Sequence, residues 1–157
     1  KRAKANTIMR IAMYEPDIPQ NLGAMMRLSA CLGLPLDIIE PCGFIWSDKK
    51  IGRAAMDYKD AVQIHKHLNW EAFLETHHDK RIILMTTKAS VPYPDFSFQD
   101  NDILLAGRES AGVPDHVHAR ADGRVIIPMS GGLRSLNIVN ATAMITGEAL
   151  RQTRWSV

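Results

Sequence analysis

Residues 103–112, Ile-Leu-Leu-Ala-Gly-Arg-Glu-Ser-Ala-Gly, join a short apolar run directly to a glycine-rich turn. Four consecutive apolar residues bounded by polar ones indicate a strand that is buried on both faces, as in a parallel sheet. The segment Arg81–Thr86, Arg-Ile-Ile-Leu-Met-Thr, indicates a second central strand of the same kind. Ligands of open parallel sheets bind beyond the carboxyl ends of the strands. The turn Gly107–Gly112 is therefore a candidate binding site.

Strand and helix patterns alternate along the rest of the chain. This alternation predicts an α/β fold with a mostly parallel sheet flanked by helices. We expect further strands over residues 8–14, 36–39, 61–65 and 125–127, and helices over 22–32, within 47–59, over 70–76 and over 137–153. Gly33 supplies a left-handed stop for the first helix.

The chain has 157 residues, of which 46% are hydrophobic and 23% charged. A chain of this length buries roughly 70% of its unfolded surface, which is enough for a core without disulfides or a structural metal. The composition excludes a disordered chain, a collagen and a small disulfide scaffold. The net charge of +2 comes from 19 basic and 17 acidic side chains and by itself favours no class of partner.

Three of the basic side chains, Lys1, Arg2 and Lys4, lie in the first eight residues, which contain no acid. Residues 9–157 therefore carry 16 basic and 17 acidic side chains, a net charge of −1. We expect residues 1–8 to form a basic leader, either a native arm or an extension before a natural start at Met9. Residues 9–157 are expected to form a single domain, because no repeat, low-complexity tract or linker divides them.

Cys31 and Cys42 are too few for a disulfide framework, and we expect Cys31 to lie in the core. No apolar run approaches the roughly 18 residues of a membrane span, and no signal peptide is recognisable. These features predict a cytoplasmic protein without a membrane partner. The six histidines form three close pairs, His65 with His67, His77 with His78, and His116 with His118. Because no carboxylate partner is evident beside them, we expect no metal site.

The segment Pro19–Arg27, Pro-Gln-Asn-Leu-Gly-Ala-Met-Met-Arg, follows the first expected strand. Asn21 lies near the expected start of a helix and Arg27 follows about two turns later. We expect the two side chains to project from related faces, where they could hold a phosphate or a ribose. The alternative is that Asn21 is an N-cap and Arg27 a solvated helix residue.

In the turn Gly107–Gly112, the glycines allow a ligand to approach the backbone closely. Glu109 could cap the following helix or accept hydrogen bonds from a ribose. Because Val113-Pro114 follows and the spacing Gly-x-Gly-x-x-Gly is absent, the turn is neither a P-loop nor a dinucleotide fingerprint. A purely structural turn remains the alternative.

The segment 126–137 shows a strand that ends at Pro128, followed by a glycine pair. Arg134, Ser135 and Asn137 then lie at the mouth of the last helix. A cation, a hydroxyl and an amide in one loop are what an adenosyl or ribosyl pocket requires. The alternative is a mobile loop in which Ser135 is an N-cap.

These three segments together resemble the ordered motifs of the SPOUT-class RNA methyltransferases. The matching residues are Asn21-x-Gly-Ala-x-x-Arg27, then Gly107-x-Glu109-x-x-Gly112, then Ile127-Pro128-Met129 with Ser135-Leu136-Asn137 and Asn140-Ala141. Five further matches resemble the small bacterial subfamily that methylates the ribose of the tRNA wobble nucleotide. They are Tyr14-Glu15-Pro16-x-Ile18-Pro19, Ile39-Glu40-Pro41, Trp46 with Asp48-Lys49, Arg53-Ala54 with Asp57-Tyr58, and Thr86-Thr87-Lys88. The resemblance covers Met9 to Trp155.

The resemblance implies a C-terminal deep trefoil knot (the SPOUT, or alpha-beta knot, fold) and a homodimer whose active site lies at the subunit interface. It also implies that S-adenosylmethionine binds in the knot. By motif position, the cofactor-binding residues are Met85, Gly107, Ile127, Met129, Ser135 and Leu136.

The implied reaction is methyl transfer from S-adenosylmethionine to the ribose 2′-hydroxyl of the wobble cytidine or uridine of tRNA. The resemblance makes Arg27 catalytic, either as the base or, because a guanidinium rarely loses its proton, as a stabiliser of phosphate and alkoxide charge. Asn21, Glu109, Ser135 and Asn137 are expected to support it, and the expected RNA-binding residues are Lys88, Arg134, Arg151 and Arg154. The alternatives are another tRNA nucleotide, ribosomal RNA, or RNA binding without catalysis.

Overall fold

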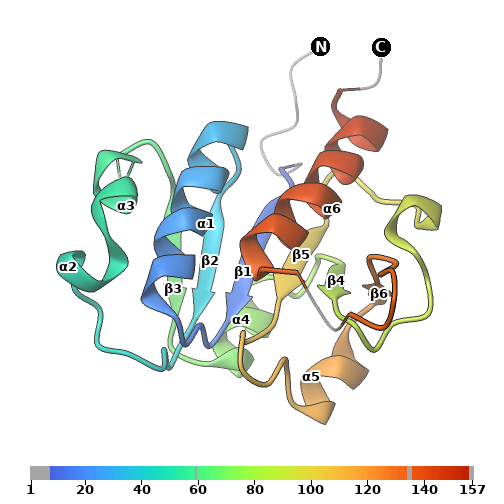
Figure 1. Ribbon diagram of the computed structural model, residues 1–157, viewed down its shortest axis with the longest axis horizontal. Coiled ribbons are helices and arrows are strands. Elements are labelled where there is room, and N and C mark those ends of the chain that lie inside the picture. The colour runs from blue at the N-terminus through green and yellow to red at the C-terminus, as the bar shows by residue number, and fades with distance from the viewer. Residues whose placement is uncertain (1–7, 59, 134–135, 156–157) are drawn as a thin grey trace.

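A six-stranded parallel sheet forms the centre of the protein in a computed structural model that describes residues 8–58, 60–133 and 136–155 (Figure 1). The strands are β1 (Arg10–Tyr14), β2 (Leu36–Ile39), β3 (Ile64–His67), β4 (Ile82–Met85), β5 (Ile103–Ala106) and β6 (Gly123–Val125). Their order across the sheet is β3-β2-β1-β5-β4-β6, and each paired strand runs parallel to its neighbour. The predicted α/β class with a parallel sheet is confirmed.

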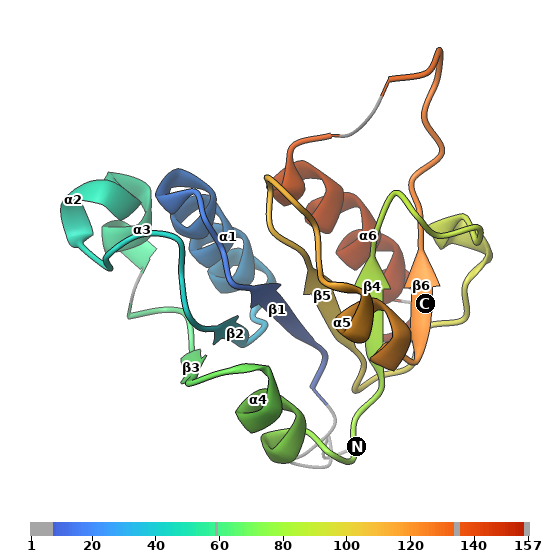
Figure 2. The ribbon, with the colours of Figure 1, turned by 90° about the horizontal axis from the view of Figure 1, so that it is seen from below.

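Helices cover both faces of the sheet, so the fold has three layers (Figure 2). One face carries α1 (Pro19–Leu32), α2 (Asp48–Ile51), α3 (Arg53–Tyr58) and α6 (Ile138–Thr153). The other face carries α4 (Trp70–Thr76) and α5 (Asp115–Arg120), and a 3-10 turn, η1, spans Tyr93–Asp95. In the part of the chain that the structure describes, no helix is long and apolar enough to cross a membrane.

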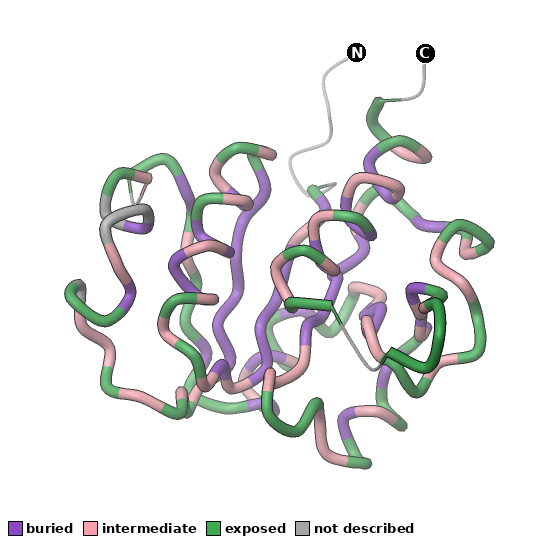
Figure 3. The backbone as a smooth tube through the Cα atoms, in the orientation of Figure 1, coloured by how far each residue is buried: buried purple, intermediate pink, exposed green. Residues whose placement is uncertain are grey.

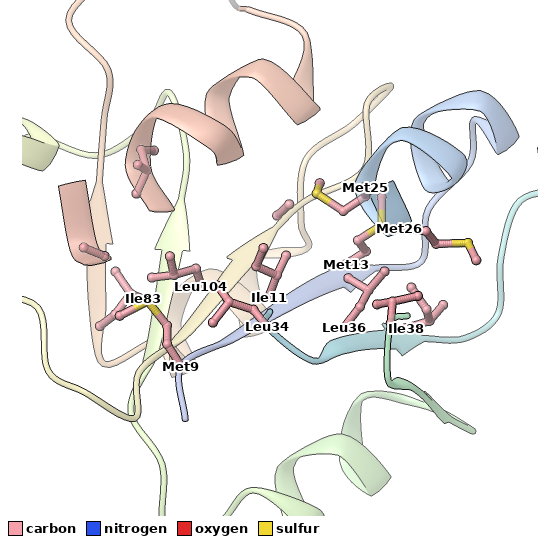
Figure 4. Packing of buried hydrophobic residues seen from close by; sticks show 14 of the residues in the cluster. Met9, Ile11, Met13, Met25, Met26, Leu34, Leu36, Ile38, Ile83 and Leu104 are labelled. Atoms are coloured by element: carbon pink, nitrogen blue, oxygen red, sulfur yellow. The ribbon is translucent and has the colours of Figure 1, made fainter. Parts of the chain in front are cut away.

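Alternate residues of each strand point to opposite layers, which divides the core in two. Ile11 and Met13 of β1 belong to the cluster beneath α1 and α6, where Met25 of α1 packs against the sheet (Figure 4). Ala12 and Tyr14 of the same strand face α4 instead. The central strands are buried along their length (Figure 3). Since each fully buried aliphatic side chain contributes roughly 1.5–3 kcal/mol, these two layers stabilise the sheet.

The first helix begins earlier than the sequence predicts. It starts at Pro19 and not at residue 22, because proline suits the first helical position, where its fixed φ and missing N–H cost nothing. Asn21 therefore lies inside the first turn, and the alternative that it is an N-cap is wrong. At the other end, Gly33 adopts a φ of 68° and its N–H donates to the Ala30 carbonyl, which confirms the predicted left-handed stop.

The weakest predictions concern the sheet edges. The strand expected over 61–65 is β3 at Ile64–His67, and the strand expected over 125–127 is β6 at Gly123–Val125. Both are edge strands that pair on one side only, and they carry polar residues that give no apolar run. The helix expected after the turn Gly107–Gly112 is the short α5, and its N-cap is Pro114 and not Glu109. Cys31 is exposed and not part of the core, because it lies on the outer side of α1.

Candidate functional site

A cavity of about 740 Å³ opens at the carboxyl ends of β4, β5 and β6. It is of the size that binds small molecules and cofactors. The loops that follow the three strands form most of its wall, and the first turns of α1 and α6 complete it. The lining includes five of the predicted cofactor residues: Met85, Gly107, Ile127, Met129 and Leu136. The sixth, Ser135, lies outside the described residues.

The turn after β5 closes on itself beside this cavity. The N–H groups of Arg108 and Gly112 each donate to the carbonyl of the other residue, both at 2.9 Å. A Cβ added at Gly107 would lie 2.9 Å from the Gly112 carbonyl carbon, and Gly112 has a φ of 61°. Glycine is therefore required at both ends of the turn. The two glycines stabilise the turn, and the turn also lines the cavity with its backbone. The segment can therefore serve both as a structural turn and as part of a binding site.

Three of the predicted catalytic residues meet at the cavity wall. Asn137 is the N-cap of α6, and its Oδ1 accepts the Val139 N–H at 2.8 Å. Its Nδ2 donates to Asn21 Oδ1 at 3.2 Å, and Asn21 Nδ2 donates to Glu109 Oε1 at 3.1 Å. The described residues thus place the cap of α6 on Asn137, while Ser135, the predicted alternative cap, lies outside them.

Asp17 joins this group, although the sequence pattern treated its position as variable. Its N–H donates to Glu109 Oε2 at 3.3 Å, and its side chain accepts a hydrogen bond from the Ser110 hydroxyl. Burial and the hydrogen-bonded Asp17 carboxyl raise the pKa of Glu109. Hydrogen bonds from Glu109 and Ser110 lower the pKa of Asp17. Of the two carboxyl groups, Glu109 therefore holds a proton more tightly than Asp17 does. The acidic residue beside Pro16 was the available signal in the sequence.

Arg27 does not reach the cavity within one chain. Its guanidinium lies 5.3 Å from the ring centroid of Tyr58 in α3, and the side chain is exposed. Asn21, in contrast, lines the cavity. Residues six positions apart are separated by about 600° around a helix, which leaves them about 120° apart in projection. The expectation that Asn21 and Arg27 share a face is therefore wrong.

The predicted RNA-binding cations lie at different ends of the molecule. Lys88 is exposed and lines the cavity, whereas Arg151 and Arg154 belong to the last turn of α6 and its C-cap. Since a helix rises about 1.5 Å per residue, Arg151 lies roughly 20 Å from the cavity end of α6. Arg151 also pairs with Glu148 at 2.6 Å. Arg134 lies outside the described residues. One chain alone does not gather these cations into one patch.

Two histidines do have a carboxylate partner, contrary to the sequence expectation. Asp37 Oδ1 lies 2.7 Å from His67 Nε2 and 3.2 Å from His77 Nε2, and Arg10 Nε donates to Asp37 Oδ2 at 2.6 Å. Burial alone raises the pKa of Asp37, but these hydrogen bonds together hold it well below its usual range. Two imidazoles and a carboxylate form a metal-type donor set. Arg10, however, already balances the charge of Asp37, so a hydrogen-bonded ion pair explains the cluster.

Comparison with known proteins identifies relatives of the whole chain. Residues 8–147 match the SpoU rRNA methylase family. A tRNA (cytidine(34)-2′-O)-methyltransferase of Beijerinckia indica is 56% identical over 146 residues, covering 90% of each chain. A solved structure described as giving insights into the 2-OH methylation of C/U34 on tRNA has a TM-score of 0.87 and 37% identity, covering 94% of this chain and 97% of that one. An AdoMet-bound rRNA methyltransferase of Sinorhizobium meliloti has a TM-score of 0.83 and 25% identity, covering 93% of this chain and 57% of that one.

Proposed function

Because the chain belongs to the SpoU methylase family, we propose that it methylates the ribose 2′-hydroxyl of nucleotide 34, the wobble cytidine or uridine of tRNA. The observation that carries this function is the 56% identity, over 90% of both chains, to a tRNA (cytidine(34)-2′-O)-methyltransferase. Ribosomal RNA is the weaker candidate, since the rRNA methyltransferase of known structure is only 25% identical.

The cavity fits S-adenosylmethionine as the methyl donor. Met85, Ile127 and Ile145 give it apolar walls suited to an adenine ring. The turn Gly107–Gly112 offers backbone groups at close range, because a Cβ at Gly107 would fill the space. Ser135 and Leu136 complete the cofactor site. When bound, S-adenosylmethionine supplies a methyl group that its sulfonium already activates, so the transfer requires no metal ion.

The residues of the chain align the ribose, exclude water and manage one proton. Hydrogen bonds join Asn21, Glu109 and Asn137 into a polar wall of the cavity. Ser135 precedes Asn137 in the loop that leads to α6. Arg27 orients an RNA phosphate and stabilises negative charge that develops on the 2′-oxygen, because a guanidinium keeps its proton at neutral pH and is a poor base. The proton leaves through phosphate or water.

The active enzyme is a homodimer. The Arg27 guanidinium lies over Tyr58 and is not among the residues that line the cavity of its own chain, so we expect a second copy to bring an Arg27 side chain to each cavity. The same arrangement brings the distant cations Lys88, Arg134, Arg151 and Arg154 of two chains to one bound tRNA. Each phosphate they neutralise adds salt-dependent affinity. The location is cytoplasmic, where the tRNA substrate is found.

The segment between β6 and α6 forms the deep trefoil knot of the family. In support, this segment walls the cavity, and α6 then packs back against β5 in the middle of the sheet. Residues 9–157 form the single catalytic domain. The first seven residues lie outside the described part of the chain, and they take no part in the reaction.

Transfer of labelled methyl from S-adenosylmethionine to unmodified tRNA tests the function. We expect label on the ribose of nucleotide 34 and none on ribosomal RNA, as mapped by nuclease digestion and mass spectrometry. Label on another nucleotide would move the target and keep the chemistry. Binding of tRNA without transfer, with several tRNA sources, would show a non-catalytic RNA-binding protein.

A further inference from the structure

A continuous chain of hydrogen bonds crosses the cavity wall and ends at Asp17. It runs from the cap of α6 at Asn137 through Asn21 to Glu109, and Glu109 Oε2 accepts the N–H of Asp17 in the loop between β1 and α1. We infer that Asp17 is a positioning residue for methyl transfer: it is the last acceptor of a chain that begins at Asn137 and orients Glu109. The inference rests on the proposed function of this cavity.

The Asp17 carboxylate at the end of this chain determines which side-chain atoms of Asn21 and Asn137 act as donors. An amide can present either its oxygen or its nitrogen, whereas an ionised carboxylate only accepts. Asp17 accepts from the Ser110 hydroxyl on one oxygen, Oδ2. Its other oxygen, Oδ1, is buried and has no donor among the described residues. Buried acceptors nearly always find a donor, and a proton on the neighbouring Glu109 carboxyl is the donor available here.

A protonated Glu109 presents one donor and retains acceptor capacity. Its proton points to Asp17, while its oxygens accept the Asn21 amide and the Asp17 N–H. Asn21 must then turn its oxygen toward Asn137, which the observed contact shows. The wall of the cavity is held neutral at Glu109, and the negative charge lies on Asp17.

The backbone around Asp17 holds its carboxyl in place. Glu15, two residues earlier, has a φ of 42°, a left-handed conformation that is strained for a residue other than glycine. Gly43 packs so closely that a Cβ there would lie 2.7 Å from the Asp17 Cβ, and its N–H donates to the Pro16 carbonyl at 2.9 Å. Strained backbone that the surrounding packing enforces is typical of functional sites.

The other charged groups around the cavity make no hydrogen bond to Glu109 among the described residues. Arg108 extends over the ring of Tyr14, 5.6 Å from its centroid, and its Nε donates to the Gly112 carbonyl at 3.0 Å. Lys88, Asp115 and His118 line the cavity from the loops after β4 and β5 and from α5. Among the described residues, the Glu109 carboxyl accepts hydrogen bonds from Asn21 Nδ2 and from the Asp17 N–H.

Two substitutions test the role of Asp17 directly. In Asp17→Asn, the amide can donate to Glu109, which then ionises and places the charge on the cavity wall. Gly43→Ala displaces Asp17 without changing any titratable group. We expect both to lower kcat for tRNA methylation at least tenfold, while the Kd for S-adenosylmethionine, from calorimetry, changes less than threefold. Asp100→Asn removes an exposed carboxylate in the loop before β5 and serves as the control for net charge.

Two further measurements separate positioning from a general structural effect. Glu109→Gln keeps a donor toward Asp17, so we expect it to retain at least ten times the kcat of Glu109→Ala. Infrared difference spectra near neutral pH should show a protonated carboxyl band in the wild-type protein, absent in Asp17→Asn and Glu109→Gln. Thermal melts identify any variant that fails to fold.

An unchanged kcat in Asp17→Asn, or the absence of the protonated carboxyl band in the wild-type protein, would overturn the inference. A wild-type protein that transfers no methyl group to tRNA would instead refute the proposed function. In that case the band and its loss in Asp17→Asn still decide whether the two carboxyls share a proton.

Discussion

Asp37 in β2 and Asp17 in the loop between β1 and α1 differ in how completely their oxygens are partnered. Asp37 accepts hydrogen bonds on both oxygens from Arg10, His67 and His77, and it is fully buried against α4. Asp17 lies in a loop beside the cavity and keeps one oxygen without a donor among the described residues. A fully satisfied carboxylate within regular elements supports the fold, whereas a partly satisfied one beside a cavity indicates function.

The largest effect on methyl transfer is expected from Arg27→Ala. Loss of the guanidinium should lower kcat about 10²- to 10³-fold, because charge on the 2′-oxygen and phosphate loses its stabiliser. The melting temperature should change little, since Arg27 is exposed. Methyl-transfer kinetics and a thermal melt measure the two quantities. Equal losses of activity and stability would show that Arg27 serves the fold.

Asp37→Ala should lower the stability of the fold and leave the catalytic rate nearly unchanged. Removal of the carboxylate leaves the Arg10 charge without its partner, which costs roughly 3 kcal/mol of the free energy of unfolding. Urea denaturation measures this loss. The kcat of the folded protein should remain within about twofold, because Asp37 is not among the described residues that line the cavity. Asp100→Ala, which removes an exposed carboxylate that does not line the cavity, is the matched control.

A smaller effect is expected from Gly107→Ala. The added methyl group would lie 2.9 Å from the carbonyl carbon of Gly112, so the turn must open. We expect the Kd for S-adenosylmethionine to rise about tenfold, equivalent to roughly 1.4 kcal/mol. Calorimetric titration with the cofactor tests this. Gly147→Ala, where a Cβ meets nothing within 4 Å, is the matched control.

Acid should weaken the stabilisation that the Asp37 cluster gives to the fold. The pKa of Asp37 is lowered in the folded protein, so the unfolded chain binds its proton more tightly. The resulting stabilisation is fully present above the unfolded pKa of about 4 and is lost as the pH falls below it. Urea denaturation at a series of pH values should show this loss in the wild-type protein and a weaker one in Asp37→Asn. Identical pH profiles would assign the acid sensitivity to other carboxyls.

The smallest effect is expected from removal of residues 1–8, which contain three basic side chains and no member of the Asp17 or Asp37 cluster. Methyl transfer by a chain that starts at Met9 should stay within about twofold of the full-length value. A large loss at physiological salt that shrinks at low salt would show that the leader contacts RNA.

Local sequence signals predicted the interior of the fold better than its edges. The predicted bounds of β2, β5 and α4 agree with the structure, and apolar runs mark the two strands directly. The polar strand β3 was displaced by three residues at its start. It pairs only with β2, so tertiary contacts, and not its own pattern, set its position.

The sequence by itself determined the parallel α/β class, the glycine turn after β5 and the helix that starts after Asn137. Each of these depends on residues close together in the chain, where the spacing of apolar, polar and glycine residues indicates which positions are buried or turn. Only the tertiary structure brought Asp17 to Glu109, 92 residues away, and Asp37 to His67 and His77, 30 and 40 residues away. Contacts of this kind form when parallel strands return to the same sheet edge or face, and periodicity carries no record of which side chains meet there.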